Sequence, residues 1–209
     1  CNLAAISAAQ GARTLLIDLD AQCNSTHYLL GDDADEPHPT VAELFEQTLR
    51  FSLRNRSAID FVCDTPFDRL HVIPSSPTLD ELHSRLESRY KIYKLREALD
   101  ELIGRFDQVW IDTPPALNFY TRSALIAAHG CLIPFDCDDF SRRALYLLLE
   151  SVREIRADHN RALEVAGIIV NQYQSRASLP QQLVSELVAE GLPVLSPPLS
   201  ATVKVRESH

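Results

Sequence analysis

Short apolar runs that end at a polar residue recur along the chain, and stretches with helical spacing lie between them. Each run predicts a buried strand, because it is short, apolar and free of charge until its end. The predicted strands cover residues 14–18, 70–73, 108–112, 131–135, 165–170 and 192–195. Apolar residues three or four positions apart predict helices over residues 1–10, 40–47, 78–86, 90–103, 118–129, 140–158 and 178–190.

Strands that alternate with helices predict βαβ crossovers, and therefore a doubly wound α/β fold whose mostly parallel sheet has helices on both faces. A chain of 209 residues is long enough for one such domain with its own core. Ligands of open α/β sheets bind beyond the carboxyl ends of the strands. The polar residues expected to gather there are Asp18, Asp20, Asp112 and Asn171.

The stretch from Thr14 to Asn24 holds the most informative of these residues. Asp18 and Asp20 are two positions apart, and side chains two apart on a strand point the same way, so both acids are expected to face one site. The polar segment 22–26 follows and is expected to be a loop able to hold water or a metal. The alternative is a strand that ends in an ordinary polar turn, where Asp and Asn are common.

The strand Gln108–Asp112 ends in a single aspartate and has the form of a Walker B element. Such a carboxylate holds Mg²⁺ beside the phosphates of a nucleotide. Together with the earlier Asp-x-Asp, this element makes the chain resemble the ParA/Soj family of partition ATPases, which are deviant-Walker P-loop ATPases related to MinD. Residues 16–24 are similar to the Walker A′ motif D-x-D-P-Q-G-N, residues 111–115 match the Walker B motif, and residues 133–141 are similar to a switch-like segment.

This resemblance covers nearly all 209 residues and implies a cytoplasmic, nucleoid-associated ATPase that uses ATP and Mg²⁺. It implies that Asp20 positions and helps activate the attacking water. It also implies that Asp18 and Asp112 support Mg²⁺ and that Asn171 contacts adenine. An ATP-dependent homodimer would bind DNA without sequence preference, and a ParB-type partner would stimulate hydrolysis.

Two basic residues, Arg176 and Lys204, match positions that this family uses to touch DNA. Their contacts to phosphates would supply affinity without reading the bases. The alternative for either residue is an ordinary solvated surface charge.

The chain departs from the family pattern in three places. Ala21 and Cys23 replace the usual Pro and Gly, and a cysteine adopts a positive φ less readily than a glycine. The P-loop, K-G-G-V-G-K-T-T, would sit just before Cys1, and the segment up to His209 stops inside a family-like stretch. We therefore expect residues 1–209 to be a single ParA-like domain truncated at both ends, which does not hydrolyse ATP at a useful rate. The alternative is a natural relative without a P-loop.

Composition narrows the function classes. The formal charge of −9 excludes a surface that is basic overall, so any DNA contact must come from a local patch. The five cysteines include no C-x-x-C pair, which favours reduced thiols over disulfides or zinc. No apolar run approaches the roughly 20 residues that span a bilayer, and the first ten residues lack the pattern of a signal peptide, so we expect no membrane partner.

Rival functions remain open on the sequence. A MinD-like or cellulose-synthesis-associated ATPase acting at a membrane would need a C-terminal amphipathic helix, and none is visible before His209. A non-hydrolysing interaction module with the same fold is the rival from another class. Retention on DNA that depends on ATP would favour the partition ATPase, whereas binding that ignores ATP would favour the interaction module.

Overall fold

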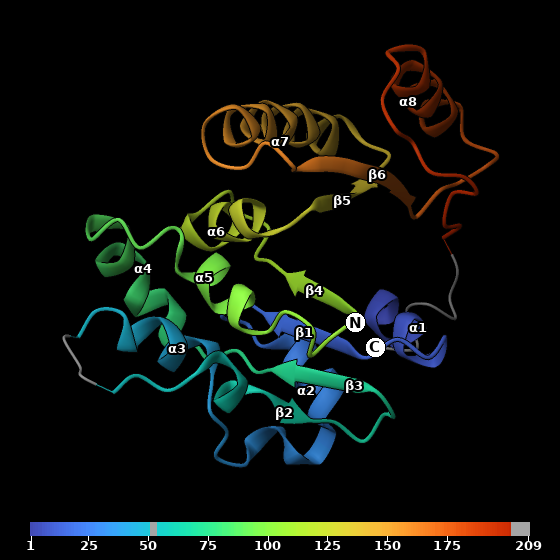
Figure 1. The fold of residues 1–209 in the computed structure, drawn as a ribbon. Helices are drawn as coiled ribbons and strands as arrows, with labels where there is room; N and C mark the ends of the chain where they lie inside the picture. The colour runs from blue at the N-terminus through green and yellow to red at the C-terminus, as the bar shows by residue number, and fades with distance from the viewer. Residues whose placement is uncertain (51–53, 202–209) are drawn as a thin grey trace. The chain divides into compact units, whose positions relative to one another are not determined.

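The computed structural model describes residues 1–50 and 54–201. The chain divides into two compact units, Cys1–Ala127 and Ala128–His209 (Figure 1). The first unit holds a four-stranded sheet in the order β2-β3-β1-β4. Its strands are β1 (Thr14–Asp18), β2 (Cys63–Asp64), β3 (Leu70–Ile73) and β4 (Gln108–Asp112). Its helices are α1 (Asn2–Ala9), α2 (Asn24–Leu30), α3 (Val41–Gln47), α4 (Thr78–Ser88), α5 (Lys94–Glu101) and α6 (Phe119–Ala127), with short 3₁₀ turns η1 (Gly31–Asp35) and η2 (Ala58–Phe61).

Strand β1 is the centre of this unit, because it pairs in parallel with both β3 and β4. All its residues are buried, as expected for a strand with helices on both faces. Leu15 and Ile17 pack on one face with α3, α4, α5 and α6, whereas Leu16 packs on the other face with α1 and α2. The doubly wound α/β fold that the sequence predicts is confirmed.

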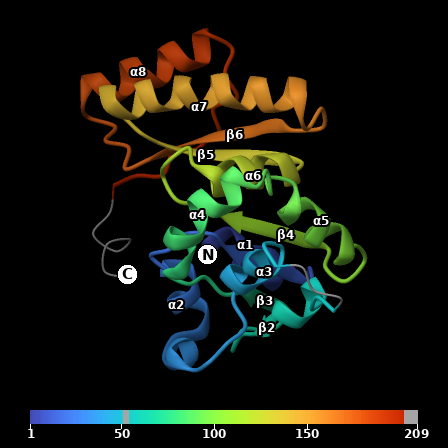
Figure 2. The same cartoon turned by 90° about the vertical axis from the view of Figure 1, so that its left-hand side faces the viewer.

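The second unit pairs β5 (Gly130–Asp136) with β6 (Glu164–Asn171) in parallel. Two helices belong to it, α7 (Asp139–Asp158) and α8 (Ser178–Ala189), and Figure 2 shows α7 as one long uninterrupted helix. The buried apolar residues of both strands and both helices form one cluster: Ile133, Phe135, Leu145, Leu149, Ile168, Val170, Leu183 and Leu187.

Three predicted elements differ from the observed ones. Residues 192–195 form no strand and make only an isolated bridge from Val194 to Ile168, because Pro193 has no N–H to donate. Helix α5 begins at Lys94 rather than at Tyr90, since the positive φ of 53° at Tyr90 interrupts the helix. The predicted polar loop 22–26 is partly helical, because α2 begins at Asn24.

The structure also describes the apolar character of the helices and the state of the cysteines. Within the described ranges, no helix is long and apolar enough to cross a bilayer. All five cysteines carry free thiols, and burial raises the pKa of four of them: Cys23, Cys63, Cys131 and Cys137.

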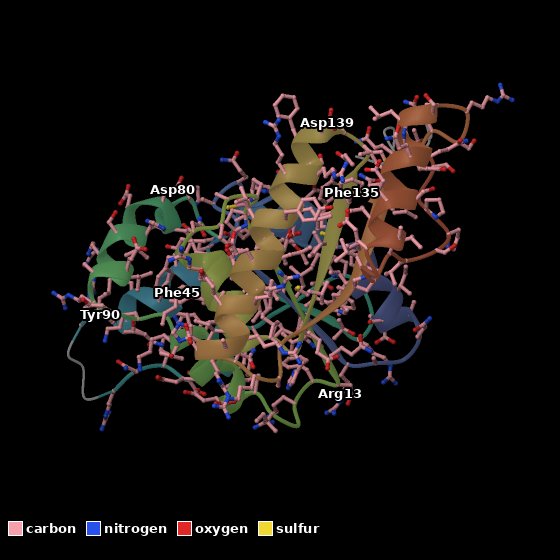
Figure 3. All side chains as sticks on the ribbon, turned by 90° about the horizontal axis from the view of Figure 1, so that it is seen from above. Arg13, Phe45, Asp80, Tyr90, Phe135 and Asp139 are labelled. Atoms are coloured by element: carbon pink, nitrogen blue, oxygen red, sulfur yellow. The ribbon has the colours of Figure 1, made fainter. Side chains whose placement is uncertain are left out.

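An ion pair joins the starts of β1 and β4 and makes stability depend on pH. Arg13, labelled in Figure 3, donates to the Asp107 carboxylate through its backbone N–H and its guanidinium, and the shortest contact is 2.7 Å. These bonds lower the pKa of Asp107 from 3.8 to about 2. The ionised form is therefore favoured by folding, so its stabilisation is present above the pKa of the unfolded chain and is lost as pH falls from about 4 to about 2.

We expect Asp107→Asn to flatten the loss of stability with acid in that window. The measurement is the urea midpoint of wild type and variant between about pH 5 and pH 2.5. Asp68→Asn is the matched control, because Asp68 is 95% exposed and lies 3.7 Å from Arg69. Parallel pH curves for wild type and Asp107→Asn would show that the pair contributes nothing.

Candidate nucleotide and metal site

Strands β1 and β4 end side by side, so two aspartates lie next to each other. Asp18 and Asp112 are partners in the parallel register, and the N–H of Leu19 donates to the carbonyl of Asp112 at 2.9 Å. Asp20 lies beyond the end of β1, where strand alternation no longer sets side-chain direction. The prediction that Asp18 and Asp20 point the same way because both lie on the strand was therefore wrong, since β1 ends at Asp18.

Asp18 is a fully buried carboxylate held by hydrogen bonds. Its Oδ2 accepts from the backbone N–H of Thr26 at 2.9 Å and from the Thr26 hydroxyl at 2.7 Å. Its Oδ1 accepts from the N–H of Asp20 at 3.1 Å. Burial raises the pKa of Asp18, the three hydrogen bonds oppose the rise, and the nearby charge of Asp112 adds to it.

Asp112 is only half-buried, in contrast to its neighbour. Its Oδ2 accepts a short hydrogen bond from the hydroxyl of Ser25, in the first turn of α2. The thiol of Cys1 lies 3.1 Å from the same hydroxyl oxygen. Asp112 therefore keeps acceptor capacity toward solvent, where a metal-bound water could reach it.

Asp20 sits in a tight turn between β1 and α2. Its Oδ1 accepts from the N–H of Gln22 at 3.0 Å, and its carbonyl accepts from the N–H of Cys23 at 2.9 Å. Cys23 has φ 57° and ψ 24°, the left-handed region that favours glycine. For other residues this conformation costs about 1–2 kcal/mol, so Cys23 carries strain at the position where the resembled motif has Gly.

The second unit has its own polar edge at the ends of β5 and β6. Asn171 ends β6 and lies opposite Asp136 in the register. A cavity of about 360 Å³ opens beside them, lined by Asp136, Cys137, Asp138, Gln172, Gln174, Ala177, Leu179 and Pro180. Asn171 itself does not line this cavity, but the two glutamines that follow it do, and Gln172 has a positive φ of 50°.

The two predicted DNA-contacting residues lie near the C-terminal end of the chain. Arg176 is exposed in the connection between β6 and α8. Lys204 lies outside the described residues.

Comparison with known proteins identifies the family. A family model described as an AAA domain matches residues 1–165. The chromosome-partitioning ATPase Soj of Thermus thermophilus is 34% identical over 190 residues, which cover 90% of this chain and 68% of that protein. The chain belongs to the ParA/Soj family.

Two further comparisons place this ParA/Soj-family chain among its relatives. The chromosome partitioning protein ParA of Myxococcus xanthus is 32% identical over 187 residues, 89% of this chain, and the chain spans 63% of that relative's length. The crystal structure of cobyrinic acid a,c-diamide synthase from Mycobacterium smegmatis, with bound ADP and magnesium, has a TM-score of 0.83 at 28% identity and covers 97% of this chain and 79% of that one. The Thermus thermophilus relative is named as an ATPase, and the structurally similar synthase holds ADP and magnesium.

The carboxylates of this ParA/Soj-family chain fit a magnesium ion. Among residues 1–50 and 54–201, no cluster of three or more His, Cys, Asp or Glu could hold a metal alone. Mg²⁺ needs no such cluster, because it keeps several waters and binds through one or two carboxylates and the nucleotide phosphates. Asp18 and Asp112 provide two adjacent carboxylates, and within the described ranges neither forms an ion pair with a lysine or arginine.

Three hydroxyl residues surround Asp18, Asp20 and Asp112. The sequence predicts Ser25 and Thr26 only as members of a polar loop, whereas in the structure each bonds to one aspartate. Ser75 donates to the carbonyl of Asp20 at 2.6 Å from a segment 55 residues away. Ser75 belongs to the segment Pro74-Ser75-Ser76-Pro77, whose residue types are typical of any turn, so no local signal distinguishes Ser75.

Proposed function

We propose that this protein is a DNA-partition ATPase, in which hydrolysis of Mg-ATP switches a homodimer on and off DNA. The observation that carries the proposal is the pairing of Asp18 with Asp112 at the ends of β1 and β4, with Asp20 in the turn that follows. Membership of the ParA/Soj family supports it.

The residues have unequal roles in this proposal. Asp20, whose side chain is partly exposed, positions and helps activate the water that attacks the γ-phosphate. Asp112 holds Mg²⁺ through water, and Asp18 supports it as the adjacent buried charge. Bound Mg²⁺ neutralises charge on the phosphates. Asn171 contacts adenine from the end of β6.

The switch requires partners outside this chain. We propose that a second copy joins in the ATP state and that Arg176 and Lys204 contribute to a local patch that binds DNA phosphates on the nucleoid. A ParB-type partner stimulates hydrolysis and releases the DNA. An exposed Arg176 is consistent with such a patch on a chain with a formal charge of −9.

Retention on DNA tests the proposal. The whole gene product is passed over nonspecific duplex DNA with ATP and Mg²⁺, with ADP, or without nucleotide, across a salt series. We expect retention with ATP only, and we expect Arg176→Ala to lower the slope of log affinity against log salt by about 1, the loss of one phosphate contact. Arg161→Ala, at another exposed arginine of the same unit, is the matched control. Equal retention on DNA with ATP, with ADP and without nucleotide would contradict this proposal and would favour a non-hydrolysing interaction module.

The residues encoded just before Cys1 provide a separate test. A K-G-G-x-G-K-[ST] segment there supplies the backbone cradle and the lysine that phosphoryl transfer requires. Its absence would contradict ATP hydrolysis by this protein.

A further inference from the structure

The segment after β3 reaches the turn that carries Asp20. Ser75 is 6% exposed and follows β3 between Pro74 and Ser76. Its hydroxyl donates to the carbonyl of Asp20 at 2.6 Å, and its backbone N–H donates to the hydroxyl oxygen of Thr26 at 2.9 Å. One residue therefore ties Asp20 to α2 from a separate part of the chain.

Thr26 links this segment to the buried aspartate. Its hydroxyl has one proton, which it donates to Oδ2 of Asp18 at 2.7 Å, so the oxygen is free to accept from Ser75. The other oxygen of Asp18 accepts from the N–H of Asp20. The four residues form a closed ring of hydrogen bonds, from Asp20 N–H to Asp18, Thr26, Ser75 and back to the Asp20 carbonyl.

The ring holds both backbone groups of Asp20 and makes no bond to its carboxylate, whose Oδ1 accepts only from the N–H of Gln22 among the described residues. Asp18 and Thr26 are 0% and 5% exposed, so the bonds form away from water, where they are stronger than at the surface. The bonds to Asp18 are charge-assisted as long as its carboxylate is ionised.

We propose that Thr26 and Ser75 are positioning residues, which fix the backbone of Asp20 so that its carboxylate is held ready for the reacting water. This inference rests on the proposed function, in which Asp20 acts on that water. Reacting groups must be held closely, since a misplacement of about 1 Å can cost about 100-fold in rate.

Hydrogen exchange tests the ring without any turnover. In the nucleotide-free whole protein, we expect Ser75→Ala to speed amide exchange in residues 19–24 by about 2- to 10-fold, the effect of losing one hydrogen bond. Ser76→Ala is the matched control, because the Ser76 hydroxyl bonds to Thr78 instead. Thr26→Val should have a larger effect, and Thr26→Ser, which keeps the hydroxyl, should restore slow exchange. Wild-type exchange in Ser75→Ala would overturn the proposal, whether or not the protein hydrolyses ATP.

Kinetics test whether the ring serves catalysis. We expect Ser75→Ala to lower kcat by about 10-fold with little change in ATP affinity, because only the position of Asp20 is disturbed. In an Asp20→Ala background the same substitution should have no further effect on kcat. An equal loss in both backgrounds, or faster exchange with an unchanged kcat, would overturn the positioning role. If the wild type hydrolyses no ATP, the proposed function fails, and the catalytic role fails with it. The exchange result still decides whether the ring of hydrogen bonds holds the turn at Asp20.

Discussion

Asp20→Ala is expected to lower ATP turnover by the whole protein by about 10²- to 10⁴-fold, the usual contribution of a positioned acid–base group. In this structure the substitution removes the carboxylate and leaves the backbone bonds of Asp20 in place. The backbone N–H and carbonyl of Asp20 make the bonds that hold the turn, and alanine keeps both. The carboxylate itself bonds only to the N–H of Gln22 among the described residues and is partly exposed, so its loss should leave folding and nucleotide binding nearly unchanged.

Two further variants test whether the loss of turnover comes from the charge of the Asp20 carboxylate. Asp32→Ala removes an exposed acid of η1 and should leave turnover at the wild-type level. Asp20→Asn keeps the size and the acceptor of the side chain but not its charge, so it should be as slow as Asp20→Ala if the charge acts on the water. Steady-state hydrolysis and nucleotide affinity are measured for each variant. Wild-type turnover in Asp20→Ala would remove Asp20 from the mechanism.

The sequence predicted the sheet edge well, because apolar runs have a strong pattern. Strand β1 is buried along its whole length, and its parallel pairing with β4 places Asp18 beside Asp112, as the two motifs implied. Strand and helix periods are local properties of the chain, so they are visible without coordinates.

The surroundings of the aspartates were less predictable. Helix α2 has seven residues and follows Cys23, which makes no side-chain cap bond, so it lacks the usual signal of a helix start. Ser75 reaches Asp20 only because β3 and β1 are neighbours in the sheet, which the spacing of residues does not reveal. The hydrogen bonds to Oδ2 of Asp18 likewise come from Thr26, eight residues further along the chain.

The fold also predicts a large loss of stability when Phe45, on α3, is truncated. Its side chain, labelled in Figure 3, is 0% exposed. Its ring centroid lies 6.0 Å from that of Phe119 in an edge-on contact and 5.6 Å from that of Tyr120 in a tilted one, and both partners are on α6. Truncation leaves a cavity and removes aromatic contacts, so we expect Phe45→Ala to lower the free energy of unfolding by about 3–5 kcal/mol.

Urea denaturation of the whole protein measures this loss, with two reference variants. Phe45→Leu refills most of the cavity and should lose clearly less. Phe67→Ala removes a ring that is 53% exposed and should change stability by no more than about 0.5 kcal/mol. Because α6 follows the loop after Asp112, a cluster that fails to hold α6 should also loosen the site, and hydrogen exchange in residues 112–119 should rise in Phe45→Ala. A loss in Phe45→Ala equal to that in Phe67→Ala would show that α3 and α6 do not share a packed core.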